Sequence, residues 1–216
     1  MPVVAMGYLP TVMGPEIMAA SDLDAVVQGE PEYAFAELLK AWREGREPAG
    51  VPGVLYRKDG AVAAGPPPRP VERFDDLPFP DHGAVDAIDY NEVMVGRRIA
   101  SIFTARGCPY PCTFCVRSFG RRLSKRSPES VLAEVRHIVN DLGIRNLRIM
   151  DDTFTLDEDR AAEICEGFIK LGPVRWTALT RLDHLTEPLA GVMARSGCQR
   201  LYCGIESGAQ RLLDFL

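Results

Sequence analysis

The chain has 216 residues, of which 46% are hydrophobic and 25% charged, and its formal net charge at pH 7 is −5. This composition is ordinary for a globular protein, and the length allows one large domain or two small ones. The acidic balance argues against a general binder of polyanions, and no apolar run approaches the roughly 20 residues of a membrane-spanning helix.

The opening stretch, MPVVAMGYLP, lacks the basic segment and the long apolar core of a signal peptide. We therefore expect a cytoplasmic protein, in which thiols stay reduced. In that compartment, six cysteines indicate metal ligands and core residues before disulfides.

The first 50 residues predict a small α/β arrangement of strand, helix, short strand and helix. The first strand is expected near residues 2–7, and the last helix spans about residues 33–44. That helix carries its apolar side chains on one face: Phe35, Leu38, Leu39 and Trp42.

The middle of the chain predicts a hairpin and then a linker. Residues 53–66 favour a β-hairpin, because Asp59-Gly60 is a strong turn signal between two apolar runs. Residues 66–83, PPPRPVERFDDLPFPDHG, are rich in proline and predict an extended linker with little structure of its own.

From residue 99 onward, strands and helices alternate. Residues 99–105 (IASIFTA) form an apolar, β-branched run typical of a buried strand. The helix that starts at Pro128 has Ser127 as its N-cap and Gly143 as its stop signal.

Three more strand–helix pairs follow. Strands are expected at residues 146–151, 175–180 and 200–206, and helices at about 157–171, near 186–197 and after residue 207. Capping-box spacings occur at Thr155 with Glu158 and at Ser207 with Gln210.

Four strands that alternate with helices predict a parallel sheet of βαβ units, and hence the α/β fold class. Polar residues follow the strands at the edge where chemistry collects in such sheets. A closed barrel needs more than four units, so we expect an open partial barrel with exposed strand edges.

The segment TARGCPYPCTFC places Cys108, Cys112 and Cys115 within eight residues. Iron–sulfur clusters are held by thiolates, and three cysteines would leave one iron of a cubane open to a small molecule. Zinc is the alternative, although a structural zinc site needs a fourth ligand that would have to come from a distant Cys203 or histidine. A disulfide would use only two of the three thiols.

The motif Cys108-x3-Cys112-x2-Cys115, with Phe114 before the last cysteine, resembles the signature of the radical S-adenosylmethionine (radical SAM) superfamily. The resemblance implies that the three cysteines bind a 4Fe–4S cluster and that Phe114 lies near the adenine of SAM. In that family the cluster cleaves SAM, and the resulting 5′-deoxyadenosyl radical abstracts a hydrogen atom from the substrate.

Other stretches resemble the branch of this superfamily that carries an N-terminal cobalamin-binding domain, among them DAVVQGEPEYAFAELL, RIMDDTFTLD and RLYCGIESGAQRLLDFL. The resemblance implies three regions: residues 1–50 as the C-terminal remnant of a Rossmann-like cobalamin-binding domain, 51–93 as hairpin and linker, and 94–216 as the N-terminal part of a radical SAM (β/α) barrel. We therefore expect a segment truncated at both ends.

Cobalamin is expected to bind weakly or not at all in this chain. The family's Asp-x-His-x-x-Gly motif, whose histidine can ligate cobalt, is absent, and none of His82, His137 and His184 lies in such a motif. These histidines are expected to be structural or exposed. Cys165, Cys198 and Cys203 are expected in the core.

The resemblance also implies SAM contacts at the carboxyl edge of the sheet. Asp151 and Asp152 follow the second strand, and Glu206 follows the fourth. Arg181 follows the third strand and suits a carboxylate of SAM, although a salt bridge to Asp183 or Asp152 is an equal alternative. Asp151 or Asp152 could instead cap the turn that follows.

The implied function is a radical reaction at an unactivated carbon, methylation or rearrangement, with a small-molecule substrate and an electron donor such as flavodoxin or ferredoxin. Two alternatives stay open. The basic run from Arg117 to Arg126 allows an RNA substrate, which the acidic balance disfavours. An inactive fragment, one piece of a split protein or a zinc-binding module is the other.

Overall fold

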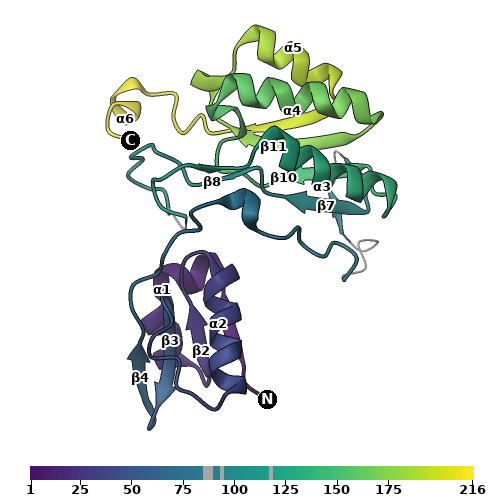
Figure 1. Cartoon of the computed structure of the whole chain (residues 1–216). Helices are drawn as coiled ribbons and strands as arrows, with labels where there is room; N and C mark the ends of the chain where they lie inside the picture. Colours follow the sequence, from purple (N-terminus) through teal and green to yellow (C-terminus); the bar gives the residue numbers. More distant parts are fainter. Residues whose placement is uncertain (85–89, 93–94, 117–118) are drawn as a thin grey trace. The chain divides into compact units, whose positions relative to one another are not determined.

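The computed structural model describes residues 1–84, 90–92, 95–116 and 119–216 (Figure 1). The chain divides into two compact units, each described by itself. The first unit consists of residues 1–72 and 114–121, and the second of residues 73–113 and 122–216.

The first unit is a four-stranded mixed sheet with two helices. Strands β1 and β2 run parallel, whereas β3 is antiparallel to β2 and to β4, in the order β1-β2-β3-β4. The elements are β1 (Val4–Met6), α1 (Tyr8–Ala20), β2 (Ala25–Val27), α2 (Pro31–Arg43), β3 (Val54–Lys58) and β4 (Ala61–Ala64).

The helices of this unit cover opposite faces of the sheet. Val26 and Leu55 pack with Met18 of α1, whereas Ala25 and Val54 pack with Leu38 of α2. Because side chains alternate between the two faces of a strand, this division explains why every residue of β2 is buried.

The predicted hairpin is confirmed as β3 and β4, with Lys58 paired to Ala61. Asp59 and Gly60 both have positive φ, 50° and 81°, as the two central residues of a type I′ turn require. The hairpin extends the sheet of the first unit.

The second unit confirms the predicted α/β class. Its main sheet is parallel, in the order β12-β11-β10-β7, so consecutive strands are neighbours. The strands and helices in chain order are β7 (Ile99–Ile102), α3 (Pro128–Asn140), β10 (Asn146–Ile149), α4 (Glu158–Leu171), β11 (Arg175–Thr180), α5 (Glu187–Arg195), β12 (Cys198–Cys203) and α6 (Gln210–Leu213).

Helices α3, α4 and α5 pack on one face of this sheet. The core between them joins apolar side chains of the helices to alternate strand residues such as Leu147 and Trp176. On the other face, Ser101, Arg148 and Leu179 are exposed. The described part of the second unit is therefore covered by these helices on one side only, as a partial barrel predicts.

The expected strand 99–105 is divided in two. Strand β7 ends at Ile102, and β8 (Ala105–Arg106) leaves the main sheet to pair antiparallel with β9 (Ser124–Lys125). A run of apolar residues does not show where a strand changes partner, which explains the error.

One predicted cap holds and two do not. Ser127 accepts a hydrogen bond from the backbone N–H of Ser130, as an N-cap does, and the structure adds Thr186, which caps α5 by accepting from the backbone N–H of Leu189. Helix α4 is capped by Asp157 and α6 follows Ala209, so the predicted caps at Thr155 and Ser207 are wrong. The hydroxyl of Thr155 pairs instead with that of Thr180, in the buried interior.

Residues 66–83, all of which the structure describes, were predicted to be an extended linker with little structure of its own. They contain no helix or strand beyond one short 3-10 turn, but their second half makes unpredicted tertiary contacts. We call residues 73–83 the strap. It contains a short 3-10 turn, η1 (Phe74–Asp76), and Phe74 is only 8% exposed. Asp75 and His82 make hydrogen bonds to α3 and its N-cap residue. Such tertiary contacts leave no local signal in a proline-rich stretch.

Candidate functional site

The cysteines lie in a loop whose two ends are held together. In the β8–β9 ladder, Ala105 pairs with Lys125 and Arg106 with Ser124. We call the intervening residues 107–123 the cysteine loop. Because the ladder closes its base, the loop begins and ends at one place beside the carboxyl end of β7.

The first part of the loop contacts the segment after β10. The backbone N–H of Gly107 donates to Oδ2 of Asp152 at 3.1 Å. The sulfur of Cys108 lies 4.0 Å from the hydroxyl oxygen of Thr153. Cys108 is half-buried and the Asp152 side chain is exposed, so the structure brings this predicted ligand and this predicted SAM contact to one edge of the sheet.

Cys112 contacts the end of β11. Nη1 of Arg181 lies 3.9 Å from the Cys112 sulfur, and the guanidinium carbon lies 3.9 Å from the centre of the Tyr110 ring. The hydroxyl of Tyr110 is hydrogen-bonded to Nε2 of His184. Tyr110, from within the loop, therefore fixes the loop against the short turn η4 (Leu182–His184).

Arg181 is also held by a carboxylate on its own turn. Its Nε and Nη2 donate to the two oxygens of Asp183 at 2.9 and 2.7 Å. Hydrogen bonding to Asp183 raises the pKa of Arg181 and lowers that of Asp183. Of the two alternatives that the sequence left open, Arg181 thus forms the bridge to Asp183.

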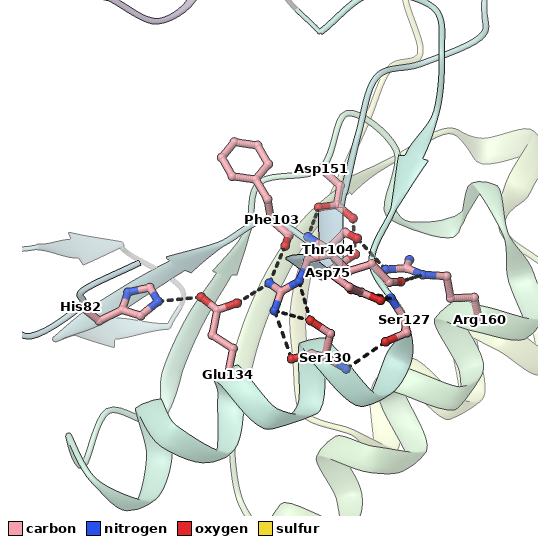
Figure 2. A network of polar contacts seen from close by, with 10 residues as sticks. Asp75, His82, Phe103, Thr104, Ser127, Ser130, Glu134, Asp151 and Arg160 are labelled. Carbon is pink, nitrogen blue, oxygen red and sulfur yellow. Dashed lines mark hydrogen bonds and ion pairs between the residues drawn. The ribbon is translucent and has the colours of Figure 1, made fainter. Parts of the chain in front are cut away.

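Asp151 is buried below this edge. It is 1% exposed, and its carboxylate accepts the backbone N–H of Thr104 at 2.6 Å and also the Thr104 hydroxyl (Figure 2). Burial raises the pKa of Asp151 to about 6, although the bonds from Thr104 oppose that rise. The structure therefore separates the adjacent aspartates, with Asp151 directed inward and Asp152 outward.

The remaining predicted site residues are exposed. Glu206 follows β12 with φ of 60°, a left-handed conformation that is uncommon for a residue other than glycine. Phe114 and Cys115 belong to residues 114–121, which group with the first unit. Within the described ranges, no three Cys, His, Asp or Glu side chains are gathered closely enough to hold a metal ion.

Cys165, Cys198 and the histidines agree with the sequence-based expectation, whereas Cys203, also expected in the core, is half-buried and lies outside the buried cluster. Cys165 is fully buried, and burial raises its pKa to about 12, while Cys198 packs at the margin of the same core. Each histidine has a structural partner: His82 pairs with Glu134, His137 with Asp141, and His184 with Tyr110.

Three residues of the site were not identified from the sequence. Tyr110, within the loop, stacks against Arg181, and Thr153 lies beside the sulfur of Cys108. Thr104 donates a hydrogen bond to Asp151. The only local signal was position, since Tyr110 lies between two loop cysteines and the threonines lie at strand ends. The pairing of each with a distant residue requires the fold.

No helix among the described residues is long and apolar enough to span a bilayer.

Comparison with known proteins gives a consistent result. The family model of the Radical SAM superfamily matches residues 102–216, which is more than half of the chain. An uncharacterized methyltransferase of Pyrococcus horikoshii is 36% identical over 90% of this chain. The cytidylyl-2-hydroxyethylphosphonate methyltransferase of Streptomyces wedmorensis is 32% identical, again over 90% of this chain.

Among solved structures, the radical SAM methyltransferase TsrM of Kitasatospora setae, with cobalamin and a [4Fe–4S] cluster bound, matches 98% of this chain with a TM-score of 0.77 and 24% identity. That likeness concerns the fold. This chain covers 42% of each of the two curated relatives and 43% of TsrM, so it spans about two fifths of their length.

Proposed function

The chain belongs to the radical SAM superfamily, and we propose that its cysteine loop holds a 4Fe–4S cluster while the carboxyl edge of its sheet binds S-adenosylmethionine. Cys108, Cys112 and Cys115 are the proposed cluster ligands. When bound, the cluster supplies the electron that cleaves SAM and so starts radical chemistry at an unactivated carbon.

The chemistry of the loop residues fits this cluster. None of these three cysteines forms a disulfide, and thiolates are the usual ligands of iron–sulfur clusters. Polar side chains lie near the sulfurs of Cys108 and Cys112, namely the Thr153 hydroxyl at Cys108 and the Arg181 guanidinium at Cys112. Hydrogen bonds and positive charge near the sulfurs stabilise the anionic cluster and tune its potential.

The observation that carries the proposal is the contact between Arg181 and Cys112, because it brings the end of β11 to the cysteine loop. Asp183 is bonded to Nε and Nη2 of Arg181, so Nη1, which faces Cys112, is the guanidinium nitrogen proposed to approach the carboxylate of SAM. The carboxylates of Asp152 and Glu206 are proposed acceptors for the SAM amino group, and Phe114 is proposed to lie against the adenine.

Asp151 takes a different part in this proposal. Its carboxylate is buried and bonded to Thr104, so we assign it to holding the sheet edge below SAM. The unusual backbone of Glu206 supports a functional role for that residue, since left-handed conformations in residues other than glycine cluster at ligand sites.

The proposed reaction is methyl transfer to a small molecule, with an electron donor such as flavodoxin or ferredoxin. Two methyltransferases among the relatives support this class. Cobalamin is proposed for the whole protein, because TsrM binds it. Residues 1–50 would then be the end of a cobalamin-binding domain, 51–93 a hairpin and linker, and 94–216 part of the catalytic core.

Anaerobic reconstitution with iron and sulfide tests the proposal. A brown protein with close to four iron and four sulfide per chain, whose reduced electron paramagnetic resonance signal changes on adding SAM, is expected. The variant Cys112→Ala should lose this cluster, while the matched control Cys203→Ala should retain it. A colourless protein that takes up one zinc ion would contradict the proposal.

A further inference from the structure

Both ends of the cysteine loop lie against one aromatic ring of the strap. The guanidinium carbon of Arg106, the last residue before the loop, lies 4.6 Å from the centre of the Phe74 ring. That of Arg126, which follows β9, lies 5.9 Å from the same centre. A ring face attracts cations at these distances, so Phe74 contacts both sides of the loop base.

A second strap residue holds the chain where it leaves the loop. The backbone N–H of Ser127 donates to both oxygens of Asp75, at 3.0 and 3.1 Å (Figure 2). Ser127 is itself the N-cap of α3. The bond to Asp75 therefore fixes the last residue between the loop base and the helix.

A third strap residue completes a buried network around Arg126. Nε2 of His82 lies 2.8 Å from one oxygen of Glu134, and the other oxygen of Glu134 pairs with Arg126. Glu134 is only 1% exposed. Arg126 also donates to the carbonyl oxygens of Phe103 at 3.1 Å and Ser130 at 3.0 Å.

The entering side of the loop is bound to the same network. The Thr104 carbonyl accepts the backbone N–H of Arg126 at 3.0 Å and Nη2 of Arg160 at 2.6 Å. Nε of Arg160 donates to the carbonyl of Arg126 at 2.8 Å. The two sides of the loop base are thus bonded to each other and to helices α3 and α4, with the strap over them.

We propose that the strap positions the cysteine loop, with Phe74 as its central positioning residue. This inference rests on the proposed function, since it concerns the geometry in which the loop presents its thiolates. A loop whose ends are fixed loses less conformational entropy when its cysteines converge on a ligand. The strap therefore slows release of the bound cluster, beyond any effect that it has on stability.

The test compares Phe74→Leu, Phe74→Tyr and Phe168→Leu. The first removes the ring face and keeps an apolar side chain, and the second keeps the ring. The third is the matched control, because Phe168 is fully buried in the core between α4 and the sheet. Each protein is reconstituted anaerobically, and the release of iron to a chelator is timed beside the melting temperature of the metal-free chain.

We expect Phe74→Leu to release iron about tenfold faster than the unsubstituted chain, in line with the loss of two cation–π contacts. Phe74→Tyr should restore the slow rate, and Phe168→Leu should lower the melting temperature without faster release. Equal rates for Phe74→Leu and the unsubstituted chain, or equal acceleration by Phe168→Leu, would overturn the inference.

Failure of the proposed function is distinguished by hydrogen exchange on the metal-free chain. If the unsubstituted chain binds no cluster, the proposed function fails. The role of the strap is then tested by the exchange rates of the Arg126 and Ser127 amides, which are bonded to Thr104 and Asp75. Phe74→Leu should speed their exchange relative to the core of β10, whereas Phe168→Leu should not. Unchanged exchange in Phe74→Leu would refute the strap on its own.

Discussion

The buried carboxylate of Asp151 accepts hydrogen bonds from both the backbone N–H and the hydroxyl of Thr104. Asp151 follows β10 and Thr104 lies between β7 and β8, so this pair joins two neighbouring strand ends directly below the cysteine loop. Because burial opposes the charged form, the pKa of Asp151 is raised to about 6 from its ordinary 3.8.

The raised pKa predicts a pH-dependent stability difference between the unsubstituted chain and Asp151→Asn. The folded state binds the Asp151 proton more tightly, so this group's contribution is fully present below about pH 4 and is lost as the pH rises through about 6. The loss is on the order of 3 kcal/mol. Urea unfolding of both proteins near pH 4 and near pH 7 measures it.

The free energy of unfolding of the unsubstituted chain, relative to Asp151→Asn, should therefore fall between the two pH values. The other carboxyl groups are common to both proteins and cancel in the comparison. Glu163→Gln, which removes an exposed carboxyl from α4, is the control and should show a constant difference. A constant or growing difference for Asp151→Asn would contradict the assignment.

Cys165 is predicted to be inert in the folded protein. Burial raises its pKa to about 12, compared with an ordinary value of 9.0, and only the thiolate reacts with alkylating reagents. The raised pKa alone lowers the reactive fraction near pH 7 by about a thousandfold. Mass spectrometry after timed alkylation should find the exposed Cys115 modified early and Cys165 only in denaturant.

Modification of Cys165 at the rate of Cys115 would show that the core opens readily. Cys198, whose pKa burial raises to about 11, should react between these two extremes.

The sequence predicted the elements of the second unit because their signals are local. Apolar spacing identified the four strands and the helices between them, and Ser127 was identified as a cap from residues within one turn. Thr155 has an equally good local signal. Its hydroxyl is taken by Thr180 of β11, and no rule about neighbouring residues could anticipate that contact.

The features of the candidate site also divide into those with a local signal in the sequence and those without one. The cysteine spacing and the polar residues after each strand are visible in the sequence, whereas the bridge from Arg181 to nearby Asp183 was only one of the alternatives that the sequence left open. The stacking of Arg181 on Tyr110 and the binding of the strap to the loop base join segments far apart in the chain. That Asp151 is directed inward and Asp152 outward could be learned only from the structure, because two adjacent aspartates after a strand look alike in the sequence.

Asp183 is predicted to tune SAM binding through Arg181. Asp183→Asn removes a charged partner from the guanidinium, which then samples other orientations over Tyr110. Because exposed ion pairs contribute about 0.2–1 kcal/mol, SAM affinity should fall by roughly two- to fivefold. Equilibrium dialysis of the reconstituted protein measures this.

The control for that experiment is Asp141→Asn, which breaks the exposed pair between His137 and Asp141 on α3. It should leave SAM affinity unchanged. Equal affinity in Asp183→Asn and the unsubstituted protein would show that Asp183 does not orient Arg181.

Gly204 is predicted to set the direction of the Glu206 side chain. A Cβ added at Gly204 would lie 2.2 Å from Oε1 of Glu206, so the observed conformation of Glu206 requires a glycine there. The obstructing atom is the end of a flexible, exposed side chain, which can move away at little cost. Gly204→Ala should therefore leave the melting temperature nearly unchanged while it redirects the Glu206 carboxylate.

The expected consequence is a loss of SAM affinity without a loss of fold, because Glu206 is a proposed acceptor for the SAM amino group. A charged hydrogen bond is worth about 1.5–3 kcal/mol, so the affinity should fall by roughly 10- to 100-fold. Gly208→Ala is the matched control, since an added Cβ there meets no atom within 4 Å. If Gly204→Ala binds SAM as well as Gly208→Ala does, Glu206 does not contact SAM in the conformation that the structure shows.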